Sequence, residues 1–425
     1  MKYTGCGRVK KGSFWTGLCL GKVCRFAAAA RAVHTAHVPV MVTQLRSLSH
    51  EETDAAINRA AEALRAGRLV VFPTETVYGV GASLRTPDPL IKVRALRADR
   101  DPRVIAKPGT WHAPSREAVL RAIPPRFPLH RRALEELAPG PVRFLVSVPA
   151  DAVPEILRRI GAAPGTLDRP GPDGTVEISV RVPSHPVATA LLERVGEPVH
   201  GERFSALGWG DDPSARPFRA RAEDMEIEAV LQDSRDHRGP PSTLVRLGLD
   251  GSAAVVEPGA LAERTIASRL RRAVLFVCTG NTCRSPMAES AARHLLEREF
   301  PASPGDVPIV IASAGTQAAV GDPAAEEGVE AMVRLGVRSE AHAARQVTRA
   351  MLDDAEVVYA MTSTHARALK ELAPDAASKV RLLDPSGENV PDPIGAGQAV
   401  YNDAARRIIE LVRLRLRELT EKPES

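Results

Sequence analysis

The chain has 425 residues, of which 44% are hydrophobic and 26% are charged, and its formal net charge is +5. This length favours two domains, and the composition favours a packed, soluble core. No apolar run approaches the roughly 18 to 20 residues that a membrane-spanning helix needs, so we expect no membrane partner.

The positive charge belongs to residues 1–40, which contain seven Lys or Arg and no Asp or Glu. Removing this +7 from +5 leaves −2 for residues 41–425, so bulk charge does not favour nucleic-acid binding by the folded body. Only two of the five cysteines lie beyond residue 40, which excludes a disulfide scaffold and favours a reducing cytoplasm. We interpret residues 1–40 as a disordered tail, or as sequence upstream of a translation start at Met41.

The first regular patterns occupy residues 41–265. The stretch "EETDAAINRAAEALRAGR", 51–68, has the apolar spacing of an amphipathic helix that ends near Gly67. "LVVFP" follows as a strand that enters a loop rich in proline and glycine, and further strands are predicted over 143–150 and 176–183. Helices and proline-rich connections between these strands predict a mixed α/β domain.

A short linker, 266–273, leads to a second α/β pattern, 274–421. Its strands alternate with helices, which predicts right-handed crossovers and a doubly wound, four-stranded parallel sheet. The predicted strands are 274–277, 309–315, 356–362 and 380–383, and the predicted helices are 286–299, 325–335, 343–352, 364–373 and 399–419.

The segment "VLFVCTGNTCRSPMAES" places Cys278 and Cys283 in a short loop between the first of these strands and a helix. A zinc site would need two more ligands, and only scattered histidines follow. A redox pair usually has two intervening residues, whereas four separate these cysteines. The pattern from Cys278 to Arg284, with five residues between, suits a third chemistry: a cysteine nucleophile in a phosphate-binding loop.

Backbone N–H groups of such a loop and the positive end of the helix dipole form a cradle for an oxyanion, and they favour the thiolate of Cys278. Arg284 can bind two phosphoryl oxygens through its forked guanidinium. Gly280 and Asn281 tolerate the left-handed backbone that turns the N–H groups inward. The residues therefore indicate a thiolate that attacks phosphorus.

Thiolate attack needs an acid for the leaving group, and the segment "VPDPIG" supplies Asp392 after the last predicted strand. Loops at the carboxyl ends of strands in a doubly wound sheet meet at one edge. We therefore expect Asp392 to lie near Cys278, although the two are far apart in the sequence.

These motifs resemble the low-molecular-weight phosphotyrosine and phosphoarginine phosphatases, and the resemblance covers about residues 273–421. It implies that Cys278 forms a phosphocysteine intermediate, that Arg284 binds phosphate, and that Asp392 acts as acid and then as base. It also implies a substrate that is a phosphorylated protein or a small phosphate ester, and no cofactor. The implied phosphate-binding loop comprises Thr279, Gly280, Asn281 as organiser, Thr282, Cys283 as a thiol able to form a protective disulfide, and Ser285 as thiolate partner.

Thr282 distinguishes members within this family. Tyrosine-specific members resemble this loop but carry an aliphatic residue there, whereas members that act on phosphoarginine resemble "CTGNTCRS". Ile394 and Gly395 stand where tyrosine-type members usually have aromatic residues. Both features favour phosphoarginine or a small substrate. Arsenate reduction by this fold needs further cysteines downstream, and none follows Cys283.

The stretch "VVFPTETVYGVGAS" resembles the YrdC-like threonylcarbamoyl-AMP synthase family, and "KPGTWH", "LAPGPVRFLVSV", "STLVRL" and "VVEPGAL" follow in that family's order. The resemblance covers roughly residues 41–262. It implies a domain that combines ATP, L-threonine and bicarbonate, with Mg2+ as the usual ion, for modification of tRNA adenosine. It also implies RNA, including double-stranded RNA, as a partner. The implied threonine- and nucleotide-binding residues are Thr76, Tyr78, Lys92, Arg94, His112, Arg181 and Ser205.

Four departures from this family's pattern bear on activity. The phosphate-binding run becomes "KVRALRADRDPRVIAKP", which leaves Lys92, Arg94 and Arg103 as alternatives. Arg143 replaces a hydroxyl after "PGPV", Leu207 replaces an asparagine in "FSALG", and "VEISVR" lacks a glycine. Lost buried polar contacts weaken an adenylate-forming site. Two hypotheses stay open: an active synthase, or a non-catalytic module that binds nucleotide or RNA.

Overall fold

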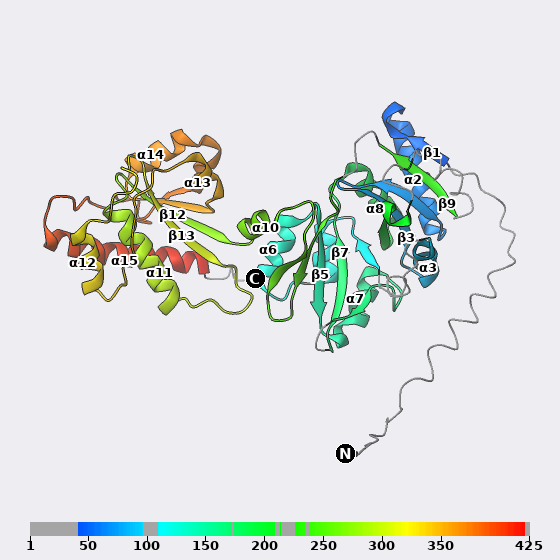
Figure 1. Ribbon diagram of the computed structural model, residues 1–425, viewed down its shortest axis with the longest axis horizontal. Helices are drawn as coiled ribbons and strands as arrows, with labels where there is room; N and C mark the ends of the chain where they lie inside the picture. Colours follow the sequence, from blue (N-terminus) through cyan, green and yellow to red (C-terminus); the bar gives the residue numbers. More distant parts are fainter. Residues whose placement is uncertain are drawn as a thin grey trace, which may run out of the picture.

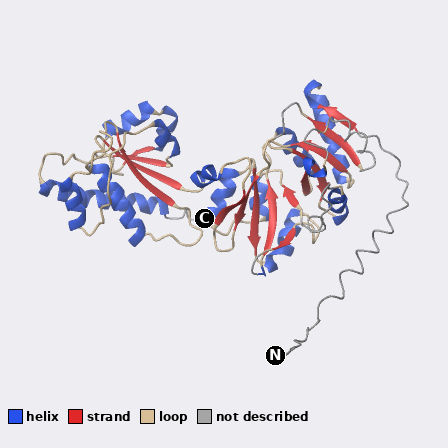
Figure 2. Ribbon diagram, viewed as in Figure 1, coloured by secondary structure: helices blue, strands red, loops and turns tan. Residues whose placement is uncertain are grey.

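The computed structural model describes residues 41–96, 109–171, 174–208, 213, 226–233 and 239–420 (Figure 1). Its strands form two separate sheets, and Figure 2 shows helices packed around both. Each sheet has its own clusters of buried hydrophobic residues. Our interpretations of residues 1–40 and of Arg103 lie outside the described residues.

Among the described residues, the N-terminal sheet has eleven strands. They are β1 (Met41–Gln44), β2 (Leu69–Pro73), β3 (Tyr78–Ser83), β4 (Thr110–His112), β5 (Val142–Val148), β6 (Asp168–Pro170), β7 (Val176–Arg181), β8 (Val199–Arg203), β9 (Ile227–Gln232), β10 (Thr243–Leu247) and β11 (Ala253–Glu257). Their order is β1-β9-β2-β3-β8-β4-β7-β5-β10-β11, with β6 paired to β7. Parallel pairs, such as β4 with β7, occur beside antiparallel pairs, such as β5 with β7. The predicted mixed α/β architecture is therefore confirmed.

Helices cover both faces of this sheet. The described helices of this part are α2 (His50–Arg65), α3 (Pro87–Ala95), α5 (Arg116–Ala122), α6 (Pro128–Leu137), α7 (Val153–Ile160), α8 (Pro186–Val195) and α10 (Glu263–Arg269), with short 3-10 helices η1 (Leu45–Ser47), η2 (Ala150–Ala152) and η4 (Phe204–Leu207). Buried residues of α2 and α8 form one apolar cluster with β2 and β9, and most other helices contribute to a second cluster. The helix predicted over 51–68 is confirmed as α2, which begins with a capping box between Ser49 and Glu52.

The C-terminal sheet is parallel throughout. Within residues 272–420 its strands are β12 (Arg272–Cys278), β13 (Ile309–Gly315), β14 (Val357–Ala360) and β15 (Val380–Leu382), in the order β13-β12-β14-β15. The helices are α11 (Arg284–Arg298), α12 (Glu326–Arg334), α13 (Arg349–Asp354), α14 (Ser363–Leu372) and α15 (Gln398–Thr420), with the 3-10 helix η6 (Pro374–Lys379). Helices α11, α12 and α15 pack on one face, and α13 and α14 pack on the other. The predicted doubly wound sheet is therefore confirmed.

One predicted helix, 343–352, is wrong in its first half. The helix begins only at Arg349, because Gln346 instead forms an isolated parallel bridge with Gly315 at the end of β13. Thr348 then caps α13 with its side chain. Pairing beside the sheet has replaced the first helical turns.

The predicted linker, 266–273, contains regular structure. Helix α10 occupies its beginning, and β12 occupies its end. Ile266 and Leu270 are buried in the core of the N-terminal sheet. Two residues, Leu270 and Arg271, separate the helix from the strand. The chain therefore passes from one sheet to the other without a free-standing connection.

Phe276 tests the packing of the C-terminal core, where it stacks on Tyr359 with ring centroids 5.7 Å apart. We predict that Phe276→Ala lowers the free energy of unfolding by about 3–5 kcal/mol, because it removes buried apolar area and leaves a cavity. Urea unfolding followed by circular dichroism measures this loss. Val320→Ala, at a side chain that is 76% exposed, is the control and should change stability by less than about 0.5 kcal/mol. Equal losses in the two variants would contradict this core.

Candidate functional site

The loop 279–283 joins the carboxyl end of β12 to the amino end of α11. Asn281 has a φ of +56°, the left-handed conformation expected in this loop. Gly315, at the end of β13, lies against the same loop, since a Cβ added there would come within 2.4 Å of Thr279 O. Glycine at this position therefore lets the strand and the loop approach closely.

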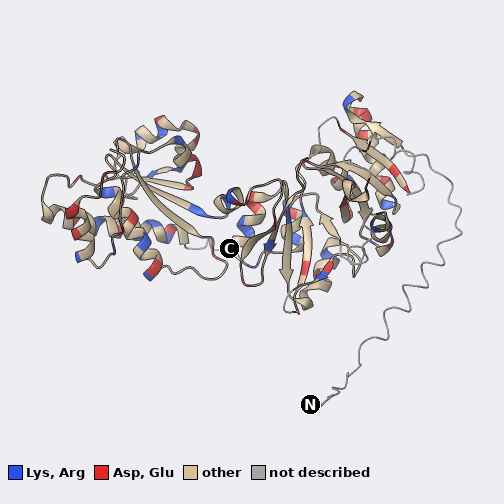
Figure 3. Ribbon diagram, in the orientation of Figure 1, with Lys and Arg blue, Asp and Glu red and all other residues tan. Residues whose placement is uncertain are grey.

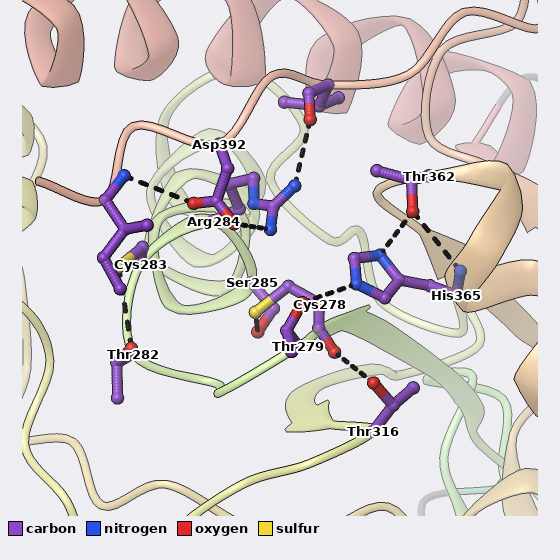
Figure 4. A network of polar contacts seen from close by, with 12 residues as sticks. Cys278, Thr279, Thr282, Cys283, Arg284, Ser285, Thr316, Thr362, His365 and Asp392 are labelled. Atoms are coloured by element: carbon purple, nitrogen blue, oxygen red, sulfur yellow. Dashed lines mark hydrogen bonds and ion pairs between the residues drawn. The ribbon is translucent and has the colours of Figure 1, made fainter. Parts of the chain in front are cut away.

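Cys278 is buried, and its Sγ lies between two polar groups. Ser285 Oγ is 3.0 Å from Sγ (Figure 4), and Asn281 N donates to Sγ over 3.3 Å. The Asn281 side-chain amide also donates to Ser285 Oγ and to Ser313 Oγ, each at 2.9 Å. This arrangement suits a sulfur atom that carries negative charge, because hydrogen-bond donors surround it.

Arg284, the first residue of α11, is buried and reaches the loop that follows β15. Its Nη1 donates to Val390 O over 3.1 Å, and its Nη2 pairs with Asp392 Oδ2 (Figure 4). The Nε atom is buried without a hydrogen-bond partner among the described residues. Asp392 is 41% exposed, so its carboxylate lies at the solvent side of the arginine. The structure thus brings Asp392 to the loop of Cys278, as predicted from the meeting of loops at the carboxyl ends of the strands.

His365, in the first turn of α14, was missed by sequence reasoning. Its Nε2 is 2.8 Å from Thr279 Oγ1, and its Nδ1 is 3.0 Å from the Oγ1 of Thr362, the N-cap of α14 (Figure 4). Burial lowers the pKa of His365, and the charge of Arg284 lowers it further, so a neutral imidazole contacts the loop. No motif connects this histidine to Cys278, and its place after a parallel strand is the one signal that the sequence offers.

Tyr401, on α15, is a second residue that sequence reasoning missed. Its hydroxyl oxygen is 3.2 Å from Cys283 Sγ, and Thr282 Oγ1 is 3.5 Å from the same sulfur. Burial raises the pKa of Tyr401, and the contact with Cys283 raises it further, so the phenol stays protonated. Cys283 therefore has hydroxyl partners of its own, on α15 and in the loop.

Three of the residues predicted to bind threonine or nucleotide lie close together in the N-terminal sheet. Arg181, at the end of β7, donates to Thr76 Oγ1 over 2.8 Å and forms a 3.0 Å ion pair with Glu75. His112 pairs in register with Arg181 across β4 and β7. Burial, and then the charge of Arg181, hold the pKa of His112 well below its ordinary value of 6.5. We call Thr76, His112 and Arg181 the arginine cluster.

Lys92 is not part of the arginine cluster. It lies on α3 and pairs with Glu226, whose carbonyl accepts from Leu69 N at the amino end of β2. Thr76 follows the opposite end of that strand. Since β2 spans roughly 16 Å, Lys92 and Thr76 lie toward opposite ends of that strand.

Tyr78, Arg94 and Ser205 have separate positions. Tyr78, the first residue of β3, donates its hydroxyl to a backbone carbonyl just after β9 over 3.1 Å. Arg94 is buried on α3, and Ser205 lies in η4. Arg143, which replaces the expected hydroxyl, stands opposite Arg181 across β5 and β7. Cross-strand partners share a face of the sheet, so a second guanidinium joins the arginine cluster.

Comparison with known proteins decides the family of the C-terminal part. Residues 273–424 match the family model described as "Low molecular weight phosphotyrosine protein phosphatase". The low molecular weight protein-tyrosine-phosphatase Ptp of Acinetobacter johnsonii is 32% identical over 133 residues, which is 31% of this chain and 87% of that protein. The chain belongs to the low-molecular-weight phosphatase family. A protein-arginine-phosphatase of Geobacillus stearothermophilus is 36% identical over 149 residues, 34% of this chain and 93% of that protein.

The phosphatase carries a second domain. Residues 62–259 match a family model described as "Telomere recombination", which includes YrdC-like proteins. The predicted fusion of a YrdC-like domain with a protein phosphatase is therefore confirmed. Among solved structures, that of a YwlE mutant from Bacillus subtilis is 28% identical and covers 35% of this chain and 99% of its own, with a TM-score of 0.33.

Three further features concern ligands and partners of the phosphatase. The described part of the chain contains no group of three or more His, Cys, Asp or Glu side chains that could hold a metal ion. None of its described helices is both long and apolar enough to cross a bilayer. Basic and acidic residues are interspersed over the described helices and strands of both domains (Figure 3).

Acid should destabilise the YrdC-like domain through His112. The folded domain keeps this imidazole neutral because its pKa is well below 6.5, whereas the unfolded chain takes up a proton below pH 6.5. Lowering the pH from 7.5 to 5.5 should therefore reduce the free energy of unfolding by about 1 kcal/mol through this residue. Urea unfolding at the two pH values measures the loss.

His112→Phe should remove this part of the pH dependence. His50→Phe is the control, because the His50 side chain is 96% exposed and should leave the pH dependence in place. If the two variants show the same pH dependence as the wild type, His112 is not held neutral by the fold.

Proposed function

We propose that the phosphatase domain hydrolyses phosphoarginine in proteins through a phosphocysteine intermediate. The observation that carries this proposal is the arrangement of Cys278 at the end of β12, Arg284 at the start of α11, and Asp392 paired with that arginine. A nucleophile, a phosphate binder and an acid therefore meet at one edge of the sheet.

In the first step the Cys278 thiolate attacks phosphorus, and an S–P bond forms as the P–N bond of phosphoarginine breaks. Loop N–H groups and Arg284 bind the phosphoryl oxygens, and this draws Arg284 away from Asp392. Asp392, in its protonated form, gives its proton to the leaving guanidine nitrogen. Ser285 Oγ, 3.0 Å from the sulfur, stabilises the thiolate before the attack.

In the second step water attacks the phosphorus atom of the phosphocysteine. Asp392, now a carboxylate, accepts one proton from the water as the new O–P bond forms. The S–P bond breaks, and its electron pair returns to Cys278 as the thiolate. Inorganic phosphate leaves, and Arg284 pairs again with Asp392.

Residues around the phosphoryl position support arginine over tyrosine as the substrate side chain. Thr282 supplies a hydroxyl in the loop, 3.5 Å from Cys283 Sγ. Ile394 is 67% exposed and Gly395 has a φ of +73°, and neither offers an aromatic ring that would stack on phosphotyrosine. The Geobacillus relative carries the name protein-arginine-phosphatase.

Thr282 should decide the substrate preference. The wild-type protein should hydrolyse a phosphoarginine protein faster than a phosphotyrosine protein, and Thr282→Ile should narrow this preference by about tenfold, because it removes a polar contact to the guanidinium. The measurement is kcat/KM for both substrates from phosphate release.

Cys278→Ser provides the mechanistic control, and it should abolish turnover of both substrates. Activity retained by Cys278→Ser would overturn the phosphocysteine route. A wild-type preference for phosphotyrosine would overturn the specificity and leave the route intact.

We propose L-threonylcarbamoyladenylate synthesis as the function of the YrdC-like domain. The arginine cluster supports this function, because Arg181 is buried and its Nε has no partner among the described residues, which suits an anionic ligand. The altered phosphate-binding run after Lys92 and the added Arg143 depart from the family's sequence pattern, so we expect slow turnover. The alternative is a non-catalytic module that binds nucleotide or RNA.

Pyrophosphate release separates these two functions. The full-length protein, given ATP, Mg2+, L-threonine and bicarbonate, should release pyrophosphate, and Arg181→Ala should reduce the rate to background. Arg85→Ala is the control, because Arg85 is 64% exposed and pairs with Glu197 away from the cluster. Release that is equal in wild type and Arg181→Ala would favour the non-catalytic module.

A further inference from the structure

Arg132 on α6 makes several contacts at the junction between the two domains. Its Nε donates to Arg269 O and its Nη2 donates to Arg271 O, each over 2.8 Å. Its Nη1 forms a 2.9 Å ion pair with Glu356, which directly precedes β14 of the phosphatase domain. One guanidinium of the YrdC-like domain therefore forms hydrogen bonds with the connecting segment, which we define as residues 266–273, and with the phosphatase domain. We call these contacts the Arg132 clamp.

Acidic residues of the phosphatase domain receive further partners from the connecting segment. Arg271 pairs with Asp354 at 2.7 Å, and Ser268 Oγ donates to the same carboxylate over 2.6 Å. Arg272 lies 3.1 Å from Glu356, on the carboxylate oxygen that Arg132 does not contact. Each of the two carboxylates thus has two partners, so neither is left as a lone charge at the junction.

A second contact between the domains depends on glycine. A Cβ added to Gly251, in the turn between β10 and β11, would come within 2.5 Å of Gly305 Cα. A Cβ added to Gly305 would come within 2.3 Å of the Phe127 ring. The backbones also bond directly, since Leu129 N donates to Gly305 O over 2.9 Å. The two surfaces therefore approach at a distance that a larger residue would prevent.

These contacts lie at the end of the phosphatase sheet opposite its site. Glu356 N donates to Ala273 O, at the amino ends of β14 and β12, whereas Cys278 ends β12 at its carboxyl end. Seven residues of extended strand place roughly 20 Å between the two ends. The YrdC-like domain therefore contacts the phosphatase domain without covering the loop of Cys278.

We propose that the YrdC-like domain is a fixed structural partner of the phosphatase domain, joined through the Arg132 clamp and the Gly251–Gly305 contact. The two domains move as one body, and the YrdC-like domain acts neither as a lid nor as a tethered, independent module. This role requires no catalysis by the YrdC-like domain, so it does not depend on the proposed synthase function.

Trypsin tests the clamp directly. The carbonyl groups of Arg269 and Arg271 belong to two peptide bonds that trypsin recognises, and both carbonyls are bonded to Arg132. In the full-length wild-type protein these bonds should resist cleavage. Arg132→Ala frees both carbonyls, so cleavage after residues 269 and 271 should be about tenfold faster, as measured by mass spectrometry of the two domain fragments.

Arg131→Ala is the matched control. Arg131 is the neighbouring residue on α6, is 58% exposed, and lies 3.9 Å from Glu135 within its own helix. Trypsin should cleave the Arg131→Ala variant at the junction at the same rate as the wild-type protein. Rapid cleavage of the wild type at the junction, or equal rates in the two variants, would overturn the proposal. Hydrolysis of an aryl phosphate before digestion should be unchanged in Arg132→Ala, because the clamp is at the far end of β12.

A second pair of variants tests the proposal independently, in case Arg132→Ala does not fold. Gly305→Ala places a methyl group against Phe127, whereas Gly387→Ala has nothing within 4 Å. Both glycines have positive φ, +83° and +88°, so the backbone strain is matched. Trypsin should cleave the Gly305→Ala variant at the junction faster than it cleaves the wild type. Small-angle X-ray scattering should show a larger radius of gyration for this variant than for the wild type. Identical behaviour of the two glycine variants would overturn the close contact between domains.

Discussion

The contacts of one fully buried asparagine, Asn281, fix the loop on which the phosphatase site depends. Its left-handed backbone turns its N–H toward Cys278, while its side-chain amide donates to two serines. Its Oδ1 accepts from Arg345 N over 2.8 Å, and its carbonyl oxygen is 2.7 Å from His342 Nε2. Glycine would allow the same φ but would make none of the side-chain bonds. The asparagine therefore supplies both the turn and its connections to neighbouring segments.

The arrangement of Cys278, Arg284 and Asp392 was predictable because these residues lie in short, contiguous motifs. Cys278 and Arg284 flank one loop, and the topology of a doubly wound sheet brings Asp392 to the same edge. The contacts of His365 and Tyr401 were not predictable, because they join the loop to helices α14 and α15 through packing that leaves no periodic signal. The missing first half of the helix predicted over 343–352 has a similar origin, since pairing with β13 outweighed local helical preference.

The YrdC-like domain shows where sequence reasoning is weakest. Its mixed sheet pairs strands that are far apart in the sequence, such as β4 with β7 and β3 with β8. The strand patterns were visible, but the register that sets His112 and Arg143 on either side of Arg181 was not. Lys92 was assigned by resemblance alone, and its role in binding a ligand stays a prediction; the structure pairs its side chain with Glu226 near the amino end of β2.

The direct passage from α10 into β12 bears on how the phosphatase domain folds. β12 is the first strand of that domain along the chain, yet it lies inside the sheet, between β13 and β14. During synthesis the earlier domain emerges and folds first, and burial of α10 in its core then anchors the next strand. β12 therefore enters the sheet already attached to a folded domain, and β13 and β14 pair on its two sides as they emerge.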